Sequence, residues 1–140
     1  MIQQYNTESK VEEFFSQKNY LSHQNESHWN IPTVIVDNYV ELGQLTALRF
    51  LEWVILNPGG VVALPTGKTP EFFIKWMEYY LNNWKSEANS GLLARLGFEP
   101  HKKPDFRSLH FFQLDEFFPI PPDHERSFHY FVQNYYIKGF

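Results

Sequence analysis

The sequence contains no cysteine, which excludes a disulfide framework and a zinc site built on thiolates. It has no basic run beyond Lys102-Lys103, and a formal net charge of -4 with a pI near 5.8 argues against a nucleic acid or a membrane surface as partner. No apolar run approaches membrane-spanning length, and residues 1–6 lack the charged and apolar regions of a signal peptide. We therefore expect a soluble cytoplasmic protein in which any anion site is local.

Aromatic residues, by contrast, are abundant: they make up 19% of the chain and include 14 phenylalanines. This share indicates either a densely packed core or an apolar surface that another part covers. With 140 residues, the chain is long enough for one domain and too short for two of ordinary size.

Residues 59–70 organise the chain, because a short apolar run there breaks into a Pro/Gly/Thr turn and then a helical pattern. Val61–Leu64 reads as a strand buried on both faces of a parallel sheet. Pro70 suits a first helical position, with Thr69 before it as the cap. The amides of Gly67, Lys68 and Thr69 would then face a phosphate or carboxylate at the helix N-terminus.

The turn has two other possible interpretations. A nucleotide-binding P-loop is rejected by spacing, because Val62 stands where that motif needs a glycine. Pro65 would also remove an amide from the phosphate-wrapping loop. A capped helix that follows a strand and binds no ligand remains open.

The rest of the chain predicts alternating strands and helices. A helix over 7–15 capped by Thr7 precedes a loop over 16–30, in which His23 and His28 are a weak metal signal. A first strand is expected over 31–37, and a helix follows from Asn38 to the stop at 57–60. After the strand at 61–64 come a second helix over 70–84 and, later, a third strand over 107–114. Residues 85–107 read as a surface insertion with one possible helical turn, and Ser127 caps a last helix to about residue 138. This order predicts an α/β fold with a right-handed parallel sheet.

Ligands of open parallel sheets bind beyond the carboxyl ends of the strands, where the turn at Thr66–Thr69 and the pair Asp115-Glu116 both fall. A phosphorylated small molecule with Asp115 as general base fits this pairing. Adjacent residues of an extended segment point to opposite sides, so Glu116 would support the loop instead. Asp115 as a solvated strand-end acid or a cap remains the alternative.

These segments resemble a known family. Residues 64–70, Leu-Pro-Thr-Gly-Lys-Thr-Pro, resemble the Leu-Pro-Thr-Gly-Gly-Thr-Pro phosphate loop of the glucosamine-6-phosphate deaminase/isomerase group, which shares its fold with 6-phosphogluconolactonases. Residues 114–117 are similar to that family's Met-Asp-Glu-Tyr segment. The similarity continues through Pro121, His124, Ser127-Phe128 and Phe131.

The resemblance implies a Rossmann-like, three-layer open parallel sheet with helices on both faces, of which this chain would be the N-terminal half. It also implies conversion of glucosamine 6-phosphate to fructose 6-phosphate and ammonia. Asp115 falls on the family's aspartate, which moves a proton between C2 and C1 of the sugar through an enediol intermediate. The family's phosphate loop corresponds to Thr66, Gly67, Lys68 and Thr69. Glu116 and Ser127 would have supporting roles, and neither a cofactor nor a metal is expected.

The chain also departs from the family. Lys68 replaces a glycine, and the family's glycine-rich segment and ring-opening histidine have no counterpart here. We therefore expect the chain alone to be inactive, with a homo-oligomer or association with the missing C-terminal half covering its apolar surface. A sugar-phosphate-binding regulatory module and a 6-phosphogluconolactonase-like hydrolase are the alternatives. Phe117 favours the deaminase branch, since the lactonase branch usually has arginine there.

Overall fold

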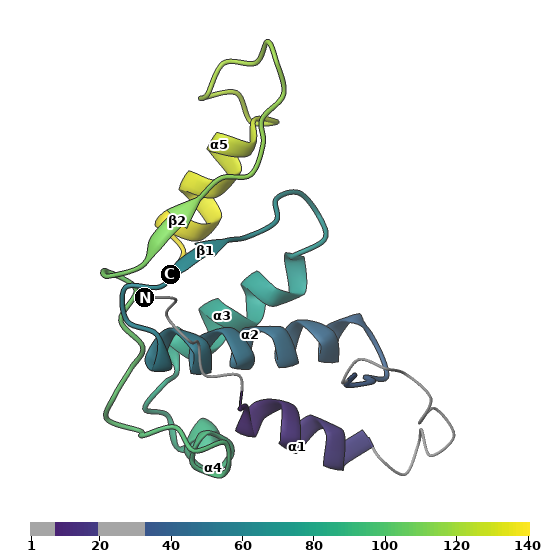
Figure 1. The fold of residues 1–140 in the computed structure, drawn as a ribbon, viewed down its shortest axis with the longest axis vertical. Helices are drawn as coiled ribbons and strands as arrows, with labels where there is room; N and C mark the ends of the chain where they lie inside the picture. The colour runs from purple at the N-terminus through teal and green to yellow at the C-terminus, as the bar shows by residue number, and fades with distance from the viewer. Residues whose placement is uncertain (1–7, 20–32) are drawn as a thin grey trace, which may run out of the picture.

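The computed structural model describes residues 8–19 and 33–140 of the chain, so the predictions for Thr7, His23 and His28 lie outside it. Figure 1 shows helices gathered below a small sheet, with the C-terminal helix beside the sheet. The helices are α1 (Lys10–Asn19), α2 (Tyr39–Leu56), α3 (Glu71–Asn82), α4 (Glu87–Arg95) and α5 (Phe128–Phe131), which continues into the π-helix η2 (Val132–Ile137). The strands are β1 (Val61–Ala63) and β2 (His110–Phe112). None of the helices in the described ranges is both long and apolar enough to cross a bilayer.

The sheet consists of β1 and β2, which pair in parallel with Val61 opposite His110 and Ala63 opposite Phe112. The predicted strands over 61–64 and 107–114 are confirmed in shorter form. Val61 is 54% exposed, so the expectation that β1 is buried on both faces is wrong. A parallel strand is buried on both faces only where helices and further strands enclose it.

The predicted strand over 31–37 is also wrong for its described part, because residues 33–36 have no regular secondary structure. Val34 and Val36 instead pack against the helical core as partly buried side chains. The β-branched side chains of this run are therefore used in packing against helices and not in a sheet. As a whole, the described chain is a helical structure with a small two-stranded parallel sheet, which is compatible with the α/β class.

The core lies where α2 crosses α3. The predicted start of α2 is confirmed, since the side chain of Asn38 accepts a hydrogen bond of 3.0 Å from the amide of Glu41. Leu48 and Leu51 on α2 and Met77 on α3 are completely buried. The helical spacing of apolar residues that predicted both helices is therefore the spacing of the core contacts.

The start of α3 differs from the prediction by one residue. Pro70 is itself the N-cap, and no side chain caps the helix, so the expectation that Thr69 caps it is wrong. The carbonyl of Pro70 accepts the amide hydrogen of Ile74 at 2.9 Å, which begins the helical ladder. Thr69 consequently stays in the turn before the helix.

Residues 85–107 are more than a surface insertion. They contain α4, and the side chains of Leu93, Leu96 and Phe98 belong to the hydrophobic core. The ring of Phe98 packs edge to face on Trp84, with 5.4 Å between the ring centroids. The prediction of a surface segment was wrong here because the glycines and prolines of this segment obscure the apolar spacing of Leu93, Leu96 and Phe98.

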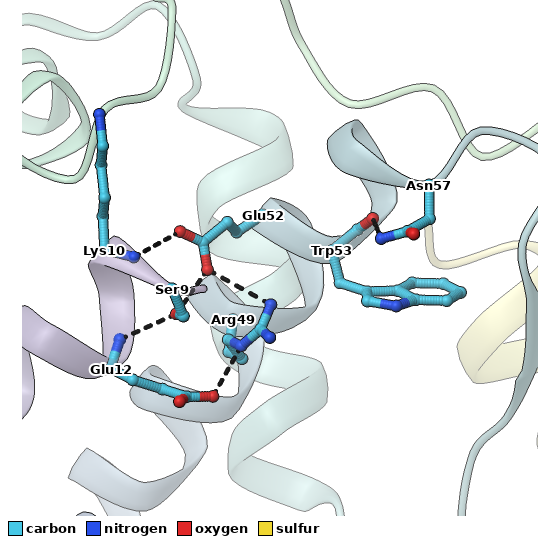
Figure 2. A network of polar contacts seen from close by, with 7 residues as sticks. All are labelled: Ser9, Lys10, Glu12, Arg49, Glu52, Trp53 and Asn57. Carbon is cyan, nitrogen blue, oxygen red and sulfur yellow. Dashed lines mark hydrogen bonds and ion pairs between the residues drawn. The ribbon is translucent and has the colours of Figure 1, made fainter. Parts of the chain in front are cut away.

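A polar network joins the N-terminus of α1 to α2 (Figure 2). The carboxylate of Glu52, 8% exposed, accepts hydrogen bonds from the Ser9 hydroxyl at 2.6 Å and the Lys10 amide at 2.9 Å. Arg49 donates to two acids: its Nη1 lies 3.4 Å from Oε2 of Glu52, and its Nε lies 2.7 Å from Oε1 of Glu12. Ser9 accepts the Glu12 amide at 3.0 Å and thus has the capping role predicted for Thr7.

A second buried acid on the same side of α2 holds the other end of α1. Glu41, 7% exposed, forms an ion pair with Lys18 and accepts the amide of Asp37 at 2.9 Å. Glu41 and Glu52 lie about three helical turns apart, which places them on one face. The two acids therefore fix both ends of α1 along α2, over the buried side chains of Val11 and Phe15.

We expect Glu52→Gln to lower the free energy of unfolding by about 1 to 2 kcal/mol, because an amide gives one acceptor oxygen where the carboxylate gives two. Urea unfolding at neutral pH measures the change. Glu12→Gln is the matched control, since Glu12 contacts the same arginine with a half-exposed side chain and should change stability by less than about 0.5 kcal/mol. Equal effects of the two variants would contradict the assignment of Glu52 as the anchor of α1.

Candidate functional site

The two segments singled out from the sequence lie at the same edge of the sheet. Because β1 and β2 are parallel and Ala63 pairs with Phe112, the carboxyl ends of the two strands are adjacent. Thr66 follows Ala63 by three residues, and Asp115 follows Phe112 by three. Carboxyl ends of parallel strands are where ligands bind in such sheets.

The turn between β1 and α3 presents free backbone amides. Gly67 has a φ of +82° and no atom within 4 Å of where a Cβ would stand, so the turn is left-handed and open at this point. Gly67, Lys68 and Thr69 are exposed, and Thr66 is half-buried. Within the described residues, no protein acceptor pairs with the amides of residues 67–69. This turn is therefore an open set of donors beside a lysine.

The residue before this turn is anchored from the far end of the chain. The hydroxyl of Tyr136, in η2, donates a hydrogen bond to the carbonyl of Pro65 across 71 residues. Tyr136 is 3% exposed, and burial raises the pKa of its hydroxyl well above the usual value. Its ring packs on Phe111 and Phe131, with 5.9 and 5.7 Å between centroids. Tyr136 could not be singled out from the sequence, since no local pattern distinguishes it from the neighbouring aromatic residues.

Asp115 and Glu116 have different surroundings. Asp115 is exposed, and its backbone carbonyl accepts a 2.8 Å hydrogen bond from Gln113. Among the described residues, no donor pairs with its carboxylate. A solvated carboxylate of this kind is available to a ligand or to water, so its position is compatible with a general base and with a solvated strand-end acid. The interpretation of Asp115 as a cap is wrong, because its carboxylate accepts no amide of the described residues.

The carboxylate of Glu116 joins the end of β2 to the start of α5. One oxygen accepts the amides of Phe117 at 2.9 Å and Phe128 at 3.0 Å. The other accepts the His129 amide at 2.9 Å and the Ser127 hydroxyl at 2.8 Å. Glu116 thus takes up amides that the first turn of a helix leaves without partners.

These contacts change the acidity of Glu116. Partial removal from water is the largest single influence and raises the pKa, although the residue as a whole is exposed. Hydrogen bonds from the amides of His129 and Phe128, the Ser127 hydroxyl and the Phe117 amide together outweigh it and lower the pKa to about 2. Glu116 is consequently ionised at neutral pH, when its contacts require an acceptor.

Ser127 is the N-cap of α5, as predicted. Its hydroxyl oxygen accepts the amide of Tyr130 at 3.2 Å while its hydrogen goes to Glu116. Ser127 is 1% exposed, so its hydroxyl both donates and accepts a hydrogen bond inside the protein. The hydroxyl of Ser127 thus joins the start of α5 directly to Glu116, a contact that the sequence did not predict.

A cavity of about 680 Å³ lies between the turn and α5. It is lined by Gly67 and Lys68 from the turn, by Ile74 from α3, and by Arg126 and Ser127 from the segment before α5. A second cavity of about 630 Å³ borders the same turn, and Thr69 lines it together with residues of α2. Neither cavity is lined by Asp115, so the structure brings the loop and α5 together around one space and leaves Asp115 outside it. Groups of three metal-ligating side chains are absent from the described ranges.

Known proteins with related sequences bear on this site. A glucosamine-6-phosphate deaminase of Halothermothrix orenii is 30% identical over 107 residues, which cover 75% of this chain and 36% of that protein. The enzyme of the same name from Clostridium tetani is 31% identical over 102 residues, covering 72% of this chain and 34% of the relative. Over the matched region, the chain is homologous to proteins named glucosamine-6-phosphate deaminase.

A third relative from Clostridium botulinum, also a glucosamine-6-phosphate deaminase, is 29% identical over 101 residues. The matched region spans about a third of the length of each of these curated relatives. No family model and no solved structure matches the chain. The similarity therefore concerns about a third of a glucosamine-6-phosphate deaminase, and it supports the family resemblance found in the phosphate loop and the acidic motif.

Proposed function

We propose that this chain is the sugar-phosphate-binding part of a glucosamine-6-phosphate deaminase-like protein. The observation that carries the proposal is the shared edge of the sheet, where the turn at 66–69 and the pair Asp115-Glu116 follow paired strands at equal distance. The relatives are named for the deamination of a phosphorylated amino sugar. A phosphate loop and an acid at one edge are the two parts that such a reaction requires.

In this proposal the phosphate lies against the turn. The unpaired amides of Gly67, Lys68 and Thr69 donate to its oxygens, and the hydroxyls of Thr66 and Thr69 add further donors. Lys68 contributes a full positive charge where the family has glycine. The open left-handed turn at Gly67 leaves the backbone accessible to the ligand.

Asp115 is proposed as the group that takes the proton from C2 of the open-chain sugar and returns it to C1. Its carboxylate is exposed and has no donor partner in the described structure, so it is free to accept a proton. Because Asp115 lies outside the cavity beside the turn, the rest of a deaminase would have to enclose it with the sugar. We therefore propose that the chain alone binds ligand without releasing ammonia.

We propose that the two-stranded sheet is part of a three-layer Rossmann-like sheet, completed by the two-thirds of the family sequence that this chain does not match. The exposed side chains of Phe112 and Leu114 are apolar surface that such a completion would cover. A regulatory module that binds sugar phosphates is the second candidate, favoured by the position of Asp115 outside the cavity.

The proposal is tested by calorimetric titration of the 140-residue chain with glucosamine 6-phosphate and fructose 6-phosphate, with glucosamine as the unphosphorylated control. We expect phosphate-dependent binding that Thr69→Ala weakens about tenfold, because a hydrogen bond to a charged group is lost. Thr46→Ala is the matched control, since Thr46 lines the same cavity as Thr69 but donates its hydroxyl to the Leu42 carbonyl at 2.7 Å.

Asp115→Asn should bind the phosphosugars as tightly as the unchanged chain, since Asp115 is assigned to proton transfer. Ammonia release is then to be measured in a protein that contains both this chain and the remaining family sequence, where we expect about a hundredfold loss or more in Asp115→Asn. Binding that does not depend on the phosphate, or that Thr69→Ala leaves unchanged, would contradict the role of the turn.

A further inference from the structure

We propose that Lys68 and Arg126 form a two-cation clamp that holds the phosphoryl group across the cavity between the turn and α5. This inference rests on the proposed function and adds to it a second cationic residue that the phosphate loop does not contain. Both residues line the same cavity of about 680 Å³, Lys68 from the turn before α3 and Arg126 from the loop before α5.

Neither side chain forms an ion pair with a described residue. In the described part of the chain, no ion pair joins Lys68 or Arg126 to a carboxylate, and Arg126 is held only through its backbone amide. Lys75, a third cation at the cavity, is by contrast paired with Glu71 on its own helix. The positive charge available to a ligand therefore comes from two separate segments that line the cavity, the turn before α3 and the loop before α5.

The backbone on the Arg126 side is fixed by hydrogen bonds. The amide of Arg126 donates to the Nδ1 of His124 at 3.1 Å, and the next amide, that of Ser127, donates to the His124 carbonyl at 2.8 Å. The Ser127 side chain is held in turn by Glu116. The long side chain of Arg126 thus starts from a fixed point at the cavity wall.

The turn that carries Lys68 is fixed through Tyr136, whose hydroxyl donates a hydrogen bond to the carbonyl of Pro65 just before the turn. Because Tyr136 belongs to η2 and η2 continues α5, the turn and the segment before α5 are both attached to the same helical element. A planar guanidinium binds two phosphate oxygens at once, whereas an ammonium acts as a point charge. The pair of Arg126 and Lys68 therefore suits a dianion with three terminal oxygens.

The cavity also carries carboxylates. Glu78 and Glu125 line it and have no ion-pair partner among the described residues. Carboxylates repel a bare phosphate but accept hydrogen bonds from hydroxyl and ammonium groups. The combination of two cations with two acids favours a phosphate that carries an amino sugar over free phosphate.

The test uses two probes on the 140-residue chain: inorganic phosphate, followed by the chemical shifts of the Gly67 amide and the Arg126 side chain, and glucosamine 6-phosphate, followed by calorimetry. We expect phosphate to shift both signals, and Arg126→Gln to weaken both ligands about tenfold or more. Lys103→Gln is the matched control, since it makes the same change in net charge at an exposed site outside the cavity.

The outcomes separate the clamp from the proposed function. Tight binding of both ligands by Arg126→Gln would overturn the clamp and leave the sugar-phosphate proposal standing. Phosphate binding that depends on Arg126, without any binding of glucosamine 6-phosphate, would support the clamp and overturn the proposed ligand. Shifts at Gly67 without a shift at Arg126 would assign the phosphate to the turn alone, and no shift at either signal would overturn both proposals.

Discussion

Gly43→Ala is expected to destabilise the protein by about 2 to 3 kcal/mol, even though alanine is the better helix former by about 1 kcal/mol. A Cβ at Gly43 would lie 2.5 Å from the Cβ and 2.7 Å from the carbonyl carbon of Phe72, and 2.9 Å from the amide nitrogen of Phe73. These atoms belong to the first turn of α3 and cannot rotate away as a side chain would. The two helices would have to separate, and the core between them would lose contact.

The matched control is Gly91→Ala, in the middle of α4. No atom lies within 4 Å of a Cβ built there, so the substitution should stabilise the protein by about 0.5 to 1 kcal/mol. Urea unfolding of both variants gives the two changes in free energy with opposite signs. A Gly43→Ala protein as stable as the unchanged chain would show that α2 and α3 are farther apart than described.

Gly43 also connects packing with the candidate site. Phe72 and Phe73 follow the turn at 66–69 by only a few residues, so a displaced first turn of α3 displaces Thr69 and Pro70 with it. In a Gly43→Ala protein that remains folded at low temperature, we therefore expect phosphosugar affinity to fall as well. The close crossing of α2 and α3 is thus one of the contacts that place the phosphate loop.

The elements predicted correctly are those whose signals are local. The apolar spacing of α2 and α3 and the caps Asn38 and Ser127 depend on residues within about one helical turn, which the sequence displays directly. The strand order β1 then β2 followed from short apolar runs between turn residues. The relation between the turn and the acidic pair followed from the geometry of parallel strands.

The features that sequence analysis missed depend on contacts between distant residues. The hydrogen bond from Tyr136 to Pro65 spans 71 residues, and nothing near either residue signals it. Leu93 lies in a segment broken by glycine and proline, so its burial becomes visible only in the folded chain. Residues 33–36 have the composition of a strand, yet their apolar side chains are used in helix packing.

Glu116→Gln is expected to loosen the start of α5 and to weaken phosphosugar binding. The carboxylate accepts five hydrogen bonds, two on one oxygen and three on the other, the fifth being a 3.4 Å contact from the Gln113 side-chain amide. An amide offers one oxygen and an NH2 group that faces donors. The amides of Phe128 and His129 should therefore exchange with solvent about tenfold faster or more. Hydrogen exchange followed by NMR at neutral pH measures the change.

The pH dependence of this effect has a definite sign. The pKa of Glu116 is lowered to about 2 in the folded chain and returns to about 4.3 on unfolding. Its stabilising contribution is therefore complete above about pH 4.5 and is lost as the pH falls toward 2. The difference in urea midpoint between the unchanged chain and Glu116→Gln should shrink over that interval, and a constant difference would contradict the assignment.

Asp115→Asn separates the roles of the two adjacent acids. Because no donor in the described residues contacts the Asp115 carboxylate, this variant should leave amide exchange in α5 and the acid dependence of stability unchanged. Glu116→Gln should change both, and should also weaken the phosphate response of Arg126, since Glu116 holds Ser127 directly after it. Faster exchange at Phe128 in Asp115→Asn would show that the two acids share one structural role, and the division between proton transfer and support would then fail.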